Sequence, residues 1–135
     1  MNKFYYKLKS FFLLESKFTT AYLKEFKDDW WWCHKISDLA GNMKPFDWFG
    51  VNKWWLIFCD AKVIENDMFK ISSLRNNQLT ALERIHLVSE KYWFSHLVFP
   101  VVQVYSKNFN DYKFIHIKEI IKIEDSWETD IIIDF

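Results

Sequence analysis

The sequence predicts one domain of the mixed α/β class, an α+β arrangement in which helices pack against a central mixed sheet. Half of the 135 residues are hydrophobic and 21% are aromatic, so the chain can bury a large core without disulfides. Apolar residues recur at helical spacing in two segments, and β-prone runs fill most of the remaining sequence. Because no repeat, linker or low-complexity tract divides residues 1–135, we expect a single domain.

The expected elements run in the order α-β-β-β-α-β-β. Apolar residues at helical spacing predict a first helix over residues 11–27. Aromatic and β-branched runs predict strands over residues 30–36, 46–51 and 54–62, and the glycine, asparagine and proline of residues 37–45 predict a loop. The second half is expected to form an irregular segment (64–75), a helix (77–92) capped by Asn76 or Asn77, strands (93–105 and 112–117), a short helix (118–123) and a final strand (127–133).

The formal net charge is zero, but the charges are unevenly distributed. Residues 1–27 carry six lysines against two glutamates, whereas residues 124–135 carry five acidic residues and no basic one. The neutral total therefore arises because an acidic C-terminal segment offsets a basic remainder. This distribution permits nucleic-acid binding, with Lys3, Lys7 and Lys9 as candidate phosphate contacts.

Several classes of protein are disfavoured. No apolar run approaches the roughly 18–20 residues of a membrane helix, and lysines interrupt the N-terminal region where a signal peptide would need an apolar stretch. The two cysteines have neither disulfide-scaffold nor metal-site spacing. We therefore expect a soluble, cytoplasmic protein that has no membrane partner.

Two aspartates could share one face of a hairpin in the segment 47–62. If Asn52-Lys53 forms a two-residue turn, Asp47 opposes Phe58 and projects from the same face as Asp60 and Lys62. The two carboxylates would then be diagonal neighbours, about 7 Å apart at the backbone. That spacing allows both of them to bind one divalent cation.

Such a site predicts metal-dependent chemistry on a phosphodiester. Carboxylates suit Mg²⁺ or Mn²⁺, which can lower the pKa of a bound water and neutralise charge on a phosphate. The backbone carbonyl of Ala61 is a candidate third ligand, and Lys62 could orient the attacking water or stabilise the pentacovalent phosphate. The alternative is that Asp47 and Asp60 are solvated strand ends. The apolar run before Asp60 favours the site, because a charge that ends a buried strand needs a partner.

In order and spacing, these residues resemble the PD-(D/E)XK nuclease superfamily, and within it the Holliday junction resolvases of the archaeal and bacterial RecU type. The resemblance covers residues 11–118. Asp47, in Phe46-Asp47-Trp48-Phe49-Gly50, matches the family's aspartate at the start of a strand, and Asp60-Ala61-Lys62 matches the (D/E)XK element. Glu15 lies in the first helix, where these resolvases carry an acid that completes the metal site. Gln78 opens the next helix, as a glutamine does near the active site of RecU-like proteins.

The resemblance implies a restriction-endonuclease-like core and a Mg²⁺- or Mn²⁺-dependent DNA endonuclease that cuts four-way junctions in pairs as a homodimer. It implies that Asp47, Asp60, the Ala61 carbonyl and Glu15 bind metal, with Lys62 and Gln78 also in the site. Lys35, just before the loop, and Ser37, within it, are further candidate DNA contacts. The chain departs from the family in having Asp60 where glutamate is usual and in lacking room for the RecU stalk insertion.

Two other functions stay open. A restriction, homing or repair endonuclease would use the same chemistry on a linear duplex. A DNA-binding or interaction module with a decayed site would not be an enzyme. Usable residues at all four expected positions argue against decay. The tryptophan runs 30–32 and 54–55 are expected to serve packing or dimerisation rather than base stacking.

Overall fold

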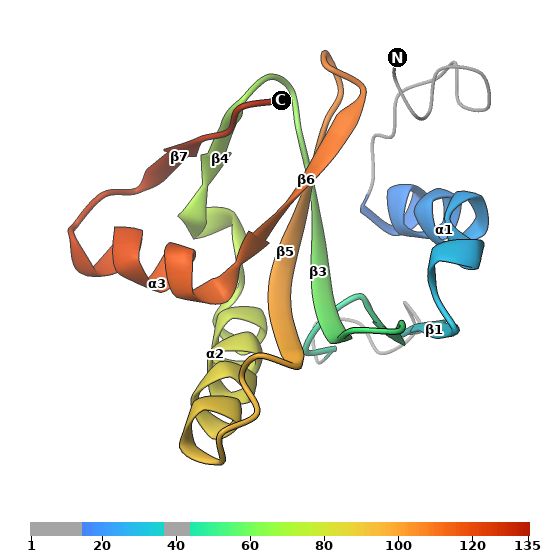
Figure 1. Ribbon diagram of the computed structural model, residues 1–135. Helices are drawn as coiled ribbons and strands as arrows, with labels where there is room; N and C mark the ends of the chain where they lie inside the picture. Colours follow the sequence, from blue (N-terminus) through green and yellow to red (C-terminus); the bar gives the residue numbers. More distant parts are fainter. Residues whose placement is uncertain (1–14, 37–43) are drawn as a thin grey trace.

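A five-stranded mixed sheet forms the centre of the protein (Figure 1). The computed structural model describes residues 15–36 and 44–135, so the predictions for Lys3, Lys7, Lys9 and Ser37 lie outside the described residues. The strand order is β1-β2-β3-β5-β6, in which only β3 and β5 are parallel neighbours. The strands are β1 (Trp32–Lys35), β2 (Trp48–Val51), β3 (Leu56–Ile64), β5 (Val98–Ser106) and β6 (Asp111–His116).

Helices cover both faces of this sheet (Figure 1). One face packs against α1 (Glu15–Glu25), and the other packs against α2 (Asn76–Lys91) and α3 (Ile117–Asp125). A second, two-stranded antiparallel sheet joins β4 (Met68–Lys70) to β7 (Asp130–Ile132) on the side of α3. Short 3₁₀ helices follow α1 and β4, at Lys27–Asp29 (η1) and Ile71–Ser73 (η3). Within the described ranges, no helix has the length and apolarity to span a bilayer.

The alternation of side chains along β3 divides the core into two layers and positions the acidic residues. Ile57, Cys59 and Ala61 pack into the cluster under α1, which also holds Phe18 and Tyr22. Phe58 packs into the cluster under α2 and α3. Because successive strand residues point to opposite faces, Asp60 and Lys62 project with Phe58 toward α2.

The predicted class, an α+β fold with a mixed sheet, is confirmed. The irregular segment predicted over 64–75 is wrong, because it contains β4 and η3. The observed order of elements therefore has one more strand before α2 than expected. The short helix and the final strand expected after the last sheet strand are α3 and β7. The predicted asparagine cap of α2 is also wrong. Arg75 occupies the N-cap, and its N–H donates to Oε1 of Gln78 in the first turn, at 3.1 Å.

The predicted two-residue turn between β2 and β3 is wrong as well. Val51 pairs with Leu56 and Trp48 pairs with Cys59, so four residues form the loop. The Asn52 side chain closes this loop, since its Oδ1 accepts from the backbone N–H groups of Trp54 and Trp55, both at 2.8 Å. The true register differs from the predicted one by two residues. An even shift keeps every side chain on its predicted face.

Candidate active site

Asp47 is fixed where β2 begins, beside the middle of β3. Its backbone N–H donates to the carbonyl of Cys59 at 2.9 Å. One carboxylate oxygen, Oδ2, accepts the N–H of Ala61 at 2.6 Å, and the other, Oδ1, lies 2.8 Å from Nζ of Lys44. Both oxygens of this nearly buried carboxylate therefore have partners, which hold it against β3 at the level of Asp60 and Ala61.

Asp60 is fully buried, and its ionic partner is the more distant ammonium group of Lys62. Neither of its carboxylate oxygens accepts a hydrogen bond from residues 15–36 or 44–135, and Lys62 Nζ lies 3.5 Å from Oδ2. Burial, and then the nearby charge of Asp47, hold the pKa of Asp60 well above its usual range, while Lys62 acts in the opposite direction. A buried carboxylate without a donor, beside a second carboxylate, fits a divalent cation that would take both as ligands.

Lys62 is anchored to α2 as well as paired with Asp60. Its Nζ donates to Oε1 of Gln78 at 3.2 Å, and the same oxygen accepts the N–H of Arg75. Lys62 and Gln78 are both buried. The ammonium group is thus held between a strand carboxylate and the first turn of a helix, so its position relative to Asp60 depends on where α2 begins.

Lys44 is a second cation that the sequence analysis missed. Its ion pair with Asp47 spans three residues, and its backbone carbonyl accepts Nδ2 of Asn77, from α2, at 3.0 Å. The spacing of Lys44 before Asp47 is the one sequence signal for this pair, and by itself it is weak. The contact to Asn77 joins residues 33 positions apart and has no local signal.

Glu15 and Lys35 occupy other positions. Glu15, the first residue of α1, lines a pocket of about 350 Å³ together with Lys62. Among the described residues, no three His, Cys, Asp or Glu side chains are grouped so that they could hold a metal ion, and the metal-binding role expected of Glu15 stays a prediction. Lys35 donates to Oγ of Ser16 at 2.8 Å and to Oγ1 of Thr20 at 3.0 Å, and thereby ties β1 to α1.

The comparisons with known proteins bear on the fold. No protein-family model matches the sequence, and no curated protein matches it significantly. Among solved structures, the chain is similar to Archaeoglobus fulgidus Hjc, a Holliday junction resolvase from an archaeal hyperthermophile. The TM-score is 0.51 at 13% identity, over 76% of this chain and 75% of that one. The chain has a resolvase-like fold. At this identity, the likeness shows the arrangement of the elements alone.

Proposed function

We propose that this protein is a divalent-metal-dependent endonuclease that hydrolyses phosphodiester bonds in four-way DNA junctions. The observation that carries the proposal is Asp60, a fully buried carboxylate that has no hydrogen-bond donor within the described chain and that stands beside Asp47. The resolvase-like fold supports DNA as the substrate and a four-way junction as its form.

Asp47, Asp60 and the carbonyl of Ala61 would hold the cation, Mg²⁺ or Mn²⁺. In a β-strand, the N–H and C=O of one residue point to the same neighbouring strand. Because the N–H of Ala61 points at the Asp47 carboxylate, its carbonyl is directed to the same edge of β3. Glu15, across the pocket that Lys62 also lines, would act through an intervening water rather than directly.

When bound, the cation would lower the pKa of a coordinated water and neutralise charge on the scissile phosphate. Lys62 would donate to the attacking water or to a phosphate oxygen, and Gln78 would keep its ammonium group in place. A cation bound to the carboxylates would offset the charge of Asp47. Lys44 would then leave Asp47 and pair with a DNA phosphate. Paired cuts across a two-fold junction need two active sites, so we propose a homodimer.

The test compares cleavage of a synthetic four-way junction and of a linear duplex with the same arm sequences. The full chain is assayed with Mg²⁺, with Mn²⁺ and with EDTA, beside the variants Asp60→Asn and Asp125→Asn. Asp125 is an exposed aspartate at the end of α3, outside the site, and serves as the matched control. We expect metal-dependent cutting of the junction by the wild type and by Asp125→Asn, and junction binding without cutting by Asp60→Asn.

Each other outcome has a distinct meaning. Equal cutting by Asp60→Asn and the wild type would remove the proposed site. Preferential cutting of the linear duplex would keep the chemistry and assign the protein to restriction-, homing- or repair-type cleavage. DNA binding without calorimetric binding of Mn²⁺ would identify a non-catalytic DNA-binding module.

A further inference from the structure

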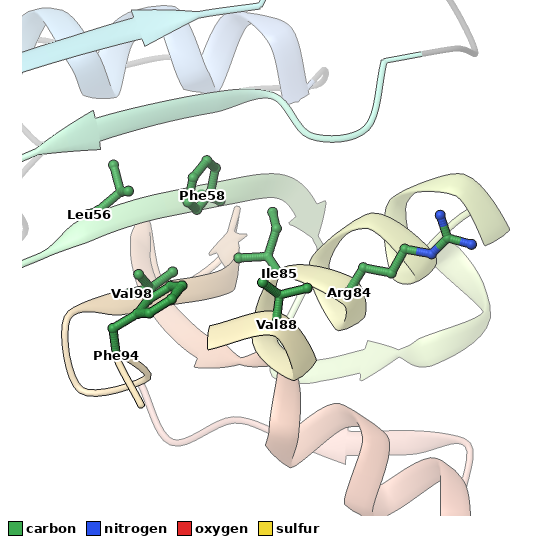
Figure 2. A pocket seen from close by; sticks show the side chains of 7 residues that line it. All are labelled: Leu56, Phe58, Arg84, Ile85, Val88, Phe94 and Val98. Carbon is green, nitrogen blue, oxygen red and sulfur yellow. The ribbon is translucent and has the colours of Figure 1, made fainter. Parts of the chain in front are cut away.

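An apolar groove lies along the C-terminal half of α2, away from the candidate active site. Its volume is about 310 Å³. Figure 2 shows six apolar side chains around it, while the guanidinium group of Arg84 points away from the others. They come from β3, α2, the α2–β5 connection and β5, and are Leu56, Phe58, Ile85, Val88, Phe94 and Val98.

A second hollow, of about 420 Å³, continues this groove toward the β2–β3 loop. The two share Leu56, Phe94 and Val98, so they form one surface. Trp54 and Trp55 line the second hollow. We call the groove, this hollow and the connecting residues 92–97 the apolar face.

Trp93 projects from the apolar face in an unfavourable backbone conformation. It follows the end of α2 with a φ of 68°, in the left-handed region that favours glycine, and is 88% exposed. The N–H of Phe94 donates to the Ser89 carbonyl at 2.9 Å, so the turn is one that helices commonly close with glycine. A large side chain there adds strain and buries almost nothing within this chain, which points to a contact outside it.

The exposed aromatic area is large enough for a stable interface. Five aromatic residues of the apolar face are each between 36% and 88% exposed, namely Trp54, Trp55, Tyr92, Trp93 and Phe94. Together they expose the equivalent of about three whole aromatic residues, or roughly 450–750 Å². The partly exposed aliphatic side chains of the face bring the total toward the roughly 800 Å² that each partner buries in a standard interface. Monomers rarely expose an apolar patch above about 300–600 Å².

We propose that the apolar face is the surface through which two copies of this chain associate, with Trp93 of each copy in the groove of the other. A two-fold interface must carry a projection and its receptacle on the same face, and this one does. Its aromatic, charge-poor composition is that of an interface core. Lys53 and Arg84 are the charged residues that line the two hollows, which is too few to follow a DNA backbone.

Only the role of this association, which is to bring two active sites to one junction, rests on the proposed function. The test measures the mass of the full chain by sedimentation equilibrium from roughly 1 to 100 µM, which covers the weak, micromolar end of the affinities of standard-size interfaces. We expect twice the chain mass of 16.6 kDa. Trp93→Gly relieves the left-handed strain, so weaker association of this variant cannot be ascribed to a damaged fold.

Trp127→Gly is a matched control. Trp127 follows α3 with a φ of 65° and is 94% exposed, but it lies outside the apolar face. We expect Trp93→Gly to raise the dimer dissociation constant by roughly 30-fold or more, as for an interface hot spot, and Trp127→Gly to leave it unchanged. Val88→Glu, which places a charge in the groove, should also weaken association.

A monomeric wild type at the highest concentration, or an unchanged dissociation constant for Trp93→Gly, would overturn the proposal. So would a monomer in which Trp93→Gly removes binding of a single-stranded oligonucleotide, since the face would then bind nucleic acid. A dimer that cuts no DNA would leave this inference standing and refute the proposed function instead. If both hold, Trp93→Gly should give singly nicked rather than linear product from a cruciform plasmid.

Discussion

Replacing Asp60 with asparagine should make the metal-free protein more stable. The wild-type carboxylate is fully buried without a hydrogen-bond donor in the described structure, and its pKa is raised by burial and then by Asp47. A carboxyl whose pKa is higher in the folded state than in the unfolded state, about 3.9, holds its proton more tightly when folded. Its ionisation therefore lowers the free energy of unfolding, progressively as the pH rises from the unfolded pKa to the folded pKa.

The size of the gain follows from the contacts. A buried polar group left unsatisfied costs about 1–3 kcal/mol. The substitution removes the ion pair with Lys62, but Lys62 keeps its hydrogen bond to Gln78, and the new amide can donate to Asp47. We expect a net gain of about 1–2 kcal/mol at neutral pH, after subtracting the lost ion pair.

Urea unfolding in EDTA at several pH values between about 4 and 7.5 measures this gain, because the range begins near the unfolded pKa. The difference between Asp60→Asn and the wild type should shrink toward zero at the acidic end. Asp47→Asn is the internal comparison and should give no gain, since Asp47 already accepts from Ala61 and pairs with Lys44. Mn²⁺ should stabilise the wild type but not Asp60→Asn. A less stable Asp60→Asn, or a difference that does not vary with pH, would refute the reasoning.

Three further predictions concern the fold around the site. Asn52→Ala removes the acceptor of two backbone N–H groups and should lower the urea-derived free energy of unfolding by about 1–2 kcal/mol. Gly50→Ala should cost about 1–3 kcal/mol in the same measurement, because an added Cβ would lie 3.2 Å from both Cys33 Cβ and the carbonyl oxygen of Trp32. Burial, with His86, lowers the pKa of His116 to about 4, so stability should be lost as the pH falls from 6.5 toward 4. His116→Asn can still cap α3 and should flatten that pH profile, which thermal unfolding would follow.

The elements that the sequence predicted well are those whose signals are local. The apolar run of β3 and the helical spacing of α2 appear in the structure within two residues of their expected bounds. The face shared by Asp47 and Asp60 depended on the parity of the strand register, and parity survived a turn of the wrong length. The register itself depended on the Asn52 side chain, which closes a four-residue loop in place of the expected two-residue turn.

The parts of the site that the sequence could not predict depend on contacts between distant segments. Lys44 reaches Asp47 from a segment that Asn77 of α2 also contacts. Lys62 is positioned through Gln78, whose side chain also closes the start of that helix. Neither arrangement has a local periodicity, because each requires the packing of α2 against β3 to exist first. Lys35 binds α1 through Ser16 and Thr20, two contacts that also lack a local signal, and the DNA contact expected of it stays a prediction.

Helix α2 connects the candidate active site with the apolar face. Gln78 lies in its first turn, and Val88 lies about 15 Å further along the same helix, at 1.5 Å per residue. The first contacts the lysine of the candidate active site, and the second lines the groove of the apolar face. An uninterrupted helix moves as a stiff rod. A shift of its distal end on association would therefore also move Gln78, and with it the ammonium group of Lys62 relative to Asp60. Partner binding and catalytic geometry would then be mechanically linked within each copy.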